Sequence, residues 1–416
     1  YFISNYNNSS NTFNIKVFEI PEIKSKEILI EPPSYTKLPL KVLSEFEYVA
    51  VPENSRIQIK VTTNKASKVY FNSESKKTLF KEDSPLTYSF LFRVASYTEY
   101  SLFLKDLEKH EFETNPNWII ETIPDLPPLA EIKEPANDKK LLGIEDLSIK
   151  YTLTDDYGIS KAQLIFQTPK EGVIAIPLSI KETANDKIIM VEGERNIPLL
   201  NLDLNNGDMI SYYIKVWDNK EVENQVNVSA VKFLSIVPGK INKKEEPPQD
   251  GQGKDFRIDD LIAELKRIYR GTIPLQFEKD LNVLADQSVI FANALGDLKT
   301  ATTLRLGQLS EIAGGQIPQE INELFELAAY YAGEAEKAMR DKSIGQAIQS
   351  ELIALQKLYQ LSKILEQDSQ QSEKPSDDSS ESKPNDKQND KKKDDKNKNE
   401  ELKAKIQKML DKLESI

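Results

Sequence analysis

The sequence contains no cysteine and a single histidine, His110. Without cysteine the chain can form no disulfide, no zinc–thiolate site and no cysteine nucleophile, and its redox compartment stays undecided. One histidine excludes a histidine-rich metal cluster. A net charge of −12 argues against a general nucleic-acid binder, which needs a basic surface. No run of about 18 apolar residues occurs, so the sequence predicts no membrane-spanning helix. No glycine-rich phosphate loop occurs either, and no cofactor is expected apart from the calcium ion considered below.

What remains is a chain of 416 residues with 39% hydrophobic residues, enough for several cores. At roughly 100–200 residues per domain, two to four units are expected. The apolar pattern changes along the chain from period 2 to period 3.6. The sequence therefore predicts a multidomain protein that is first all-β and then all-α.

Short alternating runs bounded by Pro, Asn, Asp and Ser fill residues 12–236, and examples are Arg56–Thr62, Leu86–Phe92, Lys161–Phe166 and Asn227–Phe233. Alternation places the apolar side chains of a strand on one face. Since no helical pattern intervenes, we expect antiparallel strands packed as sandwiches. The aromatic stripe Tyr88, Phe90 and Phe92 is then expected in a core, as is Trp118.

Two segments of this region resemble each other, Tyr100–Asp106 and Tyr212–Asp218. Both read Tyr-x-aliphatic-x-aliphatic-x-Asp, which suits equivalent strands of two immunoglobulin-like sandwiches. Stacked prolines at 124–128 cannot continue a central strand and make a stiff connector. We therefore predict an extension at 1–11 and tandem immunoglobulin-like domains at 12–124 and 125–236.

Residues 237–254 read as a linker, and residues 255–367 carry five amphipathic stretches joined by short connections. The first runs from Ile258 to Ile268, where Gly271 and Pro274 interrupt it. Later stretches cover 281–295, 300–313, 318–339 and the region after Ser343. Short connections predict an antiparallel bundle. Because the linker has no apolar anchor, we expect the bundle and the β domains to unfold as separate units.

The end of the sequence is polar and charged. Residues 368–399 are dominated by Ser, Asp, Lys, Asn and Gln, which predicts a disordered linker. Residues 400–416 then carry a coiled-coil-like seam of Leu402, Ile406, Met409, Leu413 and Ile416. A helix of about 17 residues is marginal alone. It must dock on the bundle, pair with a second copy, or continue beyond Ile416 into a longer coiled coil. We favour continuation or the binding of a partner.

Candidate sites are few. Asp155, Asp156 and Asp218 could bind calcium through their oxygens, or they could cap turns by hydrogen bonds to the backbone. Trp217 lies at the outward phase of its strand and is the best candidate for a protein interface in the β region. His110 sits in a charged run, which favours a solvated hairpin over a Ser-His-Asp arrangement.

Four groups of residues resemble a known family. Glu31–Pro39 is similar to a "PPxYTGxP" element, and Asp125–Pro135 followed by Tyr151–Ile159 is similar to a "P…Y…DDYG" element. Gly207 and Asp208 before Tyr212 and Asp218 are similar to the next element of this family. Ala338–Leu355 is similar to a helical "M…A…E..AL..L" segment. Together they resemble the bacterial envelope family called domain of unknown function 4175. The resemblance implies membrane helices upstream, an extracytoplasmic β region and a helical, low-complexity region, and it implies no reaction.

We therefore expect a non-enzymatic scaffold on the periplasmic or extracytoplasmic side of a bacterial membrane, anchored by a segment upstream of this sequence. Its partners would be other envelope proteins, or a second copy bound through the helical region. A cell-surface adhesin or glycan-binding protein is the alternative, and it would need an exposed aromatic platform or an ion site. An enzyme would need a concave pocket with convergent polar groups.

Overall fold

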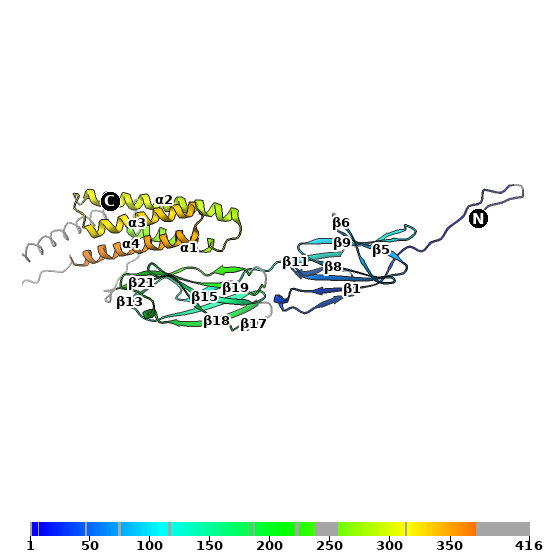
Figure 1. The fold of residues 1–416 in the computed structure, drawn as a ribbon, viewed down its shortest axis with the longest axis horizontal. Helices are drawn as coiled ribbons and strands as arrows, with labels where there is room; N and C mark the ends of the chain where they lie inside the picture. Colours follow the sequence, from blue (N-terminus) through cyan, green and yellow to red (C-terminus); the bar gives the residue numbers. More distant parts are fainter. Residues whose placement is uncertain are drawn as a thin grey trace, which may run out of the picture. The chain divides into compact units, whose positions relative to one another are not determined.

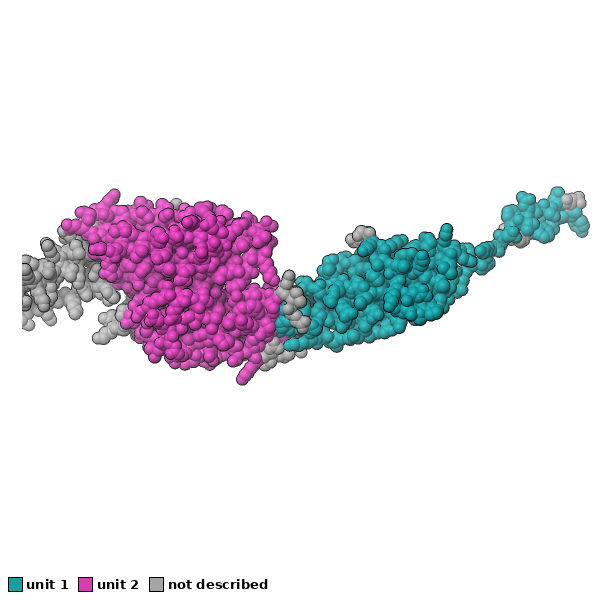
Figure 2. Space-filling model, viewed as in Figure 1, with its two compact units in different colours: residues 1–126, 156–158, 219–223 teal, residues 127–155, 159–218, 224–416 magenta. Residues whose placement is uncertain are grey.

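The computed structural model describes residues 2–6, 8–45, 48–73, 76–114, 118–181, 183–185, 188–220, 224–237, 257–312 and 314–371. The predicted helix at 400–416 and most of the predicted disordered segment lie outside these residues. The chain divides into two compact units, coloured separately in Figure 2. Unit 1 comprises residues 1–126, 156–158 and 219–223, and unit 2 comprises 127–155, 159–218 and 224–416.

Unit 1 is a β-sandwich of two sheets. One sheet has the order β2-β1-β4-β8-β7, and the other has the order β3-β11-β9-β5-β6, with β10 paired to β9. The strands are β1 (Ile23–Glu31), β2 (Lys41–Leu43), β3 (Val49–Pro52), β4 (Arg56–Thr63), β5 (Ser67–Ser73), β6 (Lys76–Leu79), β7 (Lys81–Ser84), β8 (Thr87–Arg93), β9 (Thr98–Asp106), β10 (Glu111–Glu113) and β11 (Trp118–Ile123).

Aromatic side chains fill the core of unit 1, as the sequence predicted. Phe71 lies at ring-centroid distances of 4.8 Å from Phe90, 4.8 Å from Phe92 and 4.4 Å from Tyr100. Trp118 is also buried there. The prediction that strands begin near residue 12 is wrong, because β1 begins at Ile23. Residues 11–20 alternate in polarity but lie exposed and outside any strand.

Unit 2 contains a second β-sandwich. Its sheets have the orders β12-β14-β18-β17 and β13-β21-β19-β15-β16, with β20 paired to β19. The strands are β12 (Leu129–Glu134), β13 (Lys139–Leu142), β14 (Leu147–Asp155), β15 (Ile159–Thr168), β16 (Gly172–Pro177), β17 (Thr183–Asn185), β18 (Ile188–Ile197), β19 (Met209–Asp218), β20 (Val226–Val228) and β21 (Lys232–Val237).

The internal repeat corresponds to β9 and β19, which occupy equivalent central places in the two sandwiches. The expectation of purely antiparallel sheets is wrong at two pairs. β11 pairs with β3 in parallel, and β13 pairs with β21 in parallel. In both sandwiches an early strand crosses to the sheet that contains the last strand. Such a crossover depends on long-range pairing, which periodicity in the sequence does not reveal.

The described residues after the second sandwich form four helices, namely α1 (Ile258–Leu275), α2 (Leu281–Ile312), α3 (Gln319–Arg340) and α4 (Ile344–Gln371). Two predicted helices are therefore one, since α2 runs unbroken through 296–300. Gly271 does not interrupt α1. A Cβ atom at Gly271 would lie 2.3 Å from the Phe291 ring, so the glycine permits close packing of α1 against α2.

The helices and the second sandwich share one hydrophobic core. Ile165, Tyr213 and Phe233 of the sheet belong to the same buried cluster as Leu265 and Leu355 of the helices. Figure 1 shows α1 and α4 against the sheet that contains β19 and β21, with α2 and α3 farther out. The expectation of a bundle separate from this β domain is wrong. Apolar residues on the second face of the sheet, rather than the linker, provide the attachment.

Buried polar contacts fix the register between the helices and the sheet. The Tyr269 hydroxyl on α1 donates to Gln167 Oε1 (2.5 Å) and lies 2.7 Å from Ser211 Oγ. On α4, Gln356 Oε1 accepts from Met209 N (2.6 Å), and its Nε2 donates to the Gly207 carbonyl (2.8 Å). Since unmatched buried polar groups are costly, these contacts favour a single arrangement of bundle on sandwich.

One carboxyl group is fully buried inside the bundle. Glu351 of α4 accepts a hydrogen bond from Thr272 Oγ1 of α1 at 3.0 Å. Burial raises the pKa of Glu351 to about 8, although the Thr272 hydrogen bond opposes the rise. The side chain is therefore mostly protonated at neutral pH.

Candidate functional sites

The outward face of β19 carries a surface that we call the Trp217 surface, made of Lys161, Lys215, Trp217 and Phe277. Lys161 of β15 lies directly opposite Trp217 in the register. Lys215 precedes Trp217 by two residues on β19, so both project from one face. Tyr213 lies on the same face but under the helices. The Trp217 surface therefore lies on the part of the sheet just beyond the end of α1.

Two ammonium groups flank the indole ring. Lys161 Nζ and Lys215 Nζ each lie 4.7 Å from the centre of the Trp217 ring. Lys215 Nζ also lies 4.0 Å from the ring of Phe277, just beyond α1. Burial lowers the pKa of Lys215, and the neighbouring charge of Lys161 lowers it further. A carboxylate placed here would relieve that repulsion.

The structure places Trp217 half-buried rather than free of contacts. The predicted interface residues Leu402, Ile406, Met409 and Leu413 lie outside the described residues. Lys161 and Phe277 were missed in the sequence. Lys161 could have been found by aligning the two strands, but Phe277 is 60 residues from Trp217 and reaches it only through the docking of α1.

Two of the three aspartates of the calcium hypothesis accept hydrogen bonds from backbone N–H groups. Asp218 Oδ1 accepts from Gln225 N at 2.9 Å. Asp156 Oδ2 accepts from Leu126 N at 3.3 Å, and burial raises the pKa of Asp156, with Asp125 adding to the rise. Asp155 ends β14 and is buried. The bond at Asp218 closes the loop that follows β19, and the bond at Asp156 comes from a residue 30 positions away. Calcium binding stays a prediction.

Residues of the family-like motifs meet in unit 1. Asn219 Nδ2 donates to the carbonyls of Tyr35 (2.9 Å) and Tyr157 (3.1 Å). The Tyr35 and Tyr157 rings pack edge to face at 5.8 Å. Burial raises the pKa of Tyr35 to about 12, and the charge of Asp125 adds to the rise. Gly158 adopts φ = 145°, a conformation that favours glycine. The motifs therefore encode a packed, hydrogen-bonded loop cluster.

Lys220 adds an ion pair to this cluster. Its Nζ lies 2.7 Å from Glu53 Oε1 and 3.3 Å from Asp125 Oδ2. Burial opposes the charge, but the hydrogen bonds to Glu53 and Asp125 raise the pKa of Lys220 above its usual value. Sequence reasoning missed the pair, because Lys220 and Glu53 are 167 residues apart.

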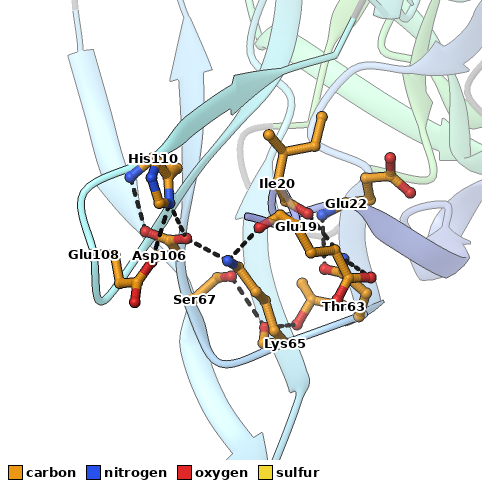
Figure 3. Close-up of polar contacts among 10 residues, drawn as sticks. Glu19, Ile20, Glu22, Thr63, Lys65, Ser67, Asp106, Glu108 and His110 are labelled. Carbon is orange, nitrogen blue, oxygen red and sulfur yellow. Dashed lines mark hydrogen bonds and ion pairs between the residues drawn. The ribbon is translucent and has the colours of Figure 1, made fainter. Parts of the chain in front are cut away.

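A second polar cluster surrounds His110 in the turn between β9 and β10 (Figure 3). Asp106 Oδ1 accepts from the His110 backbone N, and Asp106 Oδ2 lies 2.8 Å from His110 Nδ1. Lys65 Nζ lies 2.5 Å from the same Oδ2 atom. Burial opposes ionisation of Asp106, but the hydrogen bonds from Lys65 and His110 hold its pKa well below the usual range. The turn is thus closed by a charged carboxylate.

Asp106, Glu108 and His110 are close enough to hold a metal ion, with ligand atoms within 4.8 Å of one another. The Lys65 ammonium already lies against the central carboxylate, so a cation would have to displace it. Ser67 Oγ donates to the Lys65 carbonyl at 3.0 Å. Figure 3 draws no contact between Ser67 and His110, and the arrangement is that of a structural turn.

The His110 turn also holds the segment before β1. The Phe18 ring stacks on His110 at 3.7 Å with an interplanar angle of 7°. Lys65 Nζ donates to the Glu19 carbonyl. Asn64 Nδ2 donates to the Ile20 carbonyl (2.9 Å), and Asn64 Oδ1 accepts from Glu22 N (2.8 Å). Residues 18–22 are therefore attached to the first sandwich by the side chains of Asn64, Lys65 and His110.

The fold and these sites define a tandem β-sandwich protein whose second sandwich carries a four-helix bundle. Residues 8–202 match the family described as Domain of unknown function (DUF4175). This match confirms the resemblance seen in the motifs Glu31–Pro39 and Tyr151–Ile159. The match ends inside unit 2, so the helical segment Ala338–Leu355 lies beyond it.

Two solved structures are similar in part. The fibronectin(III)-like modules of Clostridium thermocellum CbhA have 14% identity and a TM-score of 0.18, covering 48% of this chain and 95% of that chain. Rst D1-D2 has 6% identity and a TM-score of 0.22, covering 52% of this chain and 100% of that chain. No curated protein sequence matches. The sandwich architecture therefore stands on the strands and sheets described above.

No helix among the described residues is long and apolar enough to cross a membrane.

Proposed function

We propose that the chain is a non-enzymatic scaffold on the extracytoplasmic side of a bacterial cell membrane, where it binds an acidic segment of another envelope protein. The Trp217 surface is the observation that carries this proposal. It combines an indole, a second aromatic ring and two ammonium groups within 4.7 Å of the ring centres. Tryptophan is enriched among residues that dominate binding energy.

The surface is also held rigidly before binding. Trp217 and Lys215 belong to a central strand, and Phe277 follows a helix that is fixed to the same sheet by Tyr269. Binding therefore requires little ordering, which favours affinity. An acidic partner would neutralise two lysines that repel each other, so charge and shape favour the same class of ligand.

A glycan-binding role is the alternative from the sequence. Sugars bind by stacking on an open aromatic ring, but the Lys161 and Lys215 ammonium groups lie over the Trp217 ring. A sugar would have to displace both lysines. The acidic protein segment is therefore the better-supported ligand.

The proposed location rests on the family resemblance and can be tested separately. Alkaline phosphatase, which is active only after export, would be fused behind residue 371 of the complete protein in its own cell. High activity, together with low fluorescence of a cytoplasm-dependent reporter at the same place, is expected. The reverse pattern would rule out the extracytoplasmic location.

Binding can be tested by photo-crosslinking in intact cells. A photoreactive residue would replace Val226, which lies opposite Trp217 in the register, and a control would replace exposed Ile188 on β18. We expect a discrete crosslinked product at position 226 only. The product should disappear with Lys161→Glu plus Lys215→Glu and remain with Lys161→Arg plus Lys215→Arg. A product that ignores the charge reversal would contradict the proposal.

A further inference from the structure

The bundle has one face that no described residue covers. Every exposed large hydrophobic side chain in the described part of the four helices lies on α2 or α3, and none lies on α1 or α4. They are Leu281, Val283, Val289, Ile290 and Leu304 on α2, and Leu327 and Tyr330 on α3. α1 and α4 use their apolar residues against the sheet. On α2, Val283, Ile290 and Leu304 are spaced by multiples of seven residues and so lie along one side of the helix, whereas Leu281 and Val289 lie on other sides. We call the exposed sides of α2 and α3 the outer face.

The composition of α2 also indicates that its exposed side is a contact surface. In its 32 residues only five are charged, whereas 29% of the whole chain is charged. Leu304 is 62% exposed and Ile290 is 53% exposed. A solvent-facing helix normally carries charged residues there. Exposed apolar residues gathered on one side of a domain mark a contact surface.

We propose that residues 400–416 of the same chain form a fifth helix that docks on this outer face of α2 and α3. The seam of this segment, from Leu402 to Ile416, spans 14 residues. Ile290 and Leu304 on α2 are also 14 residues apart, with Asp297 midway. Two heptads in each partner match in length, about 21 Å at 1.5 Å per residue.

The connection to the bundle is long enough. The short links between consecutive helices place the end of α4 at the same end of the bundle as the start of α3 and the end of α2. Leu304 lies eight residues before the end of α2, about 12 Å along the helix. The 28 residues 372–399 have a root-mean-square span of about 30 Å if flexible. The outer face therefore lies within reach.

The length of the connecting segment, residues 372–399, also favours docking within one chain over pairing of two chains. A flexible connection of this length gives an effective concentration of the order of millimolar. A second copy at micromolar concentration competes at a disadvantage of roughly a thousandfold. The seam and the outer face are both apolar, so docking removes both from water at once.

The absence of cysteine makes the test direct, because one introduced cysteine carries one label. An environment-sensitive dye would be attached at Asp297→Cys on α2 in the full chain. Its emission would be compared with that of the chain that also carries Leu402→Asp plus Leu413→Asp. The matched control is Gln407→Asp plus Ser415→Asp, which adds the same charge on the opposite side of the predicted helix.

We expect a red shift of the dye in the Leu402→Asp plus Leu413→Asp chain, none in the matched control, and a monomer in both at all concentrations. Leu304→Asp should give the same shift. A peptide of residues 400–416 should reverse the shift of the Leu402→Asp plus Leu413→Asp chain only at millimolar concentration. A mass that falls in sedimentation with the seam substitutions would show pairing of two copies and overturn the proposal. Identical emission in the intact and substituted chains would also overturn it.

Discussion

The two sandwiches use the same strand in different ways. In unit 1, β9 places Ser101 at the outward position, where its hydroxyl donates to Glu113 Oε1 at 2.6 Å. In unit 2, the equivalent position of β19 is Tyr213, which packs into the core shared with the helices. At the next outward position the polarity is reversed, since Phe103 of β9 corresponds to Lys215 of β19. The two sandwiches therefore differ in the expected sense at the position that the helices cover, where unit 1 has a serine and unit 2 has a tyrosine.

The difference was visible in the sequence as a change in pattern. Met209–Ile214 are all buried, so β19 reads as a nearly continuous apolar run. A strand that is buried on both faces has such a continuous apolar run, whereas a strand with one solvent-exposed face alternates.

The two units can be followed separately by fluorescence, because each contains one tryptophan, Trp118 in unit 1 and Trp217 in unit 2.

The largest effect should come from Phe233→Ala, which removes a fully buried ring between the sheet and α1. We expect a loss of about 3–5 kcal/mol from unit 2. In urea, Trp217 fluorescence and the helical circular dichroism should shift together, while Trp118 fluorescence stays unchanged. Phe71→Ala is the matched change in unit 1 and should shift only Trp118. If the helical circular dichroism were lost at a different urea concentration from the Trp217 signal, the helices and the second sandwich would not unfold as one unit.

Glu351→Gln should change how unit 2 responds to pH. Burial raises the folded pKa to about 8 from the usual 4.5, so the protonated folded form is favoured. That stabilisation is complete below pH 4.5 and is lost as pH rises towards 8. The wild-type chain should lose about 3 kcal/mol between pH 5 and 7.5 relative to Glu351→Gln. Urea titrations at several pH values, followed by Trp217 fluorescence, measure the free energy of unfolding of both chains. The same pH dependence in the wild type and in Glu351→Gln would contradict the prediction.

Lys220→Met tests the loop cluster of unit 1. The change removes an ammonium group 2.7 Å from Glu53 and 3.3 Å from Asp125, two carboxylates held close together. We expect a loss of about 1–3 kcal/mol, read at Trp118 in urea. Lys81→Met on exposed β7 is the control and should change little. An equal effect of the two substitutions would mean that the ion pair is not stabilising.

The smallest effect is expected for Phe18→Ala, which removes the ring stacked on His110. A loss of about 1 kcal/mol is expected from the aromatic contact. Limited proteolysis should cut the segment before β1 faster, while the unfolding of Trp217 stays the same. Val17→Ala is the control, because Val17 is 87% exposed. Equal cleavage of the two variants would show that the stack does not hold the segment.

Local patterns predicted the elements, and long-range contacts were out of reach. Alternation located β4, β8 and β15, and the 3.6 period located the helices, since both depend on neighbours in sequence. The run Asn227–Phe233 is not one strand, because it covers β20 and the start of β21 with residues 229–231 outside any strand between them. The break expected at Gly271 failed because the glycine serves a contact with Phe291. Among site residues, the partly exposed position of Trp217 follows from its phase on the strand, and its role in an interface stays a prediction. Lys220 and Phe18 were not found, because their partners Glu53 and His110 are distant in sequence.

The division of the chain into units has a consequence for how such proteins can be recombined. Residues 156–158 and 219–223 belong to unit 1 although they follow strands of the second sandwich. A gene fragment that stops at Leu126 would encode all strands of the first sandwich but neither Tyr157 nor Lys220. A single recombination boundary at residue 126 therefore does not transfer unit 1 as a whole, because unit 1 is discontinuous in the sequence. Sequence exchange between relatives has to carry three separate stretches together.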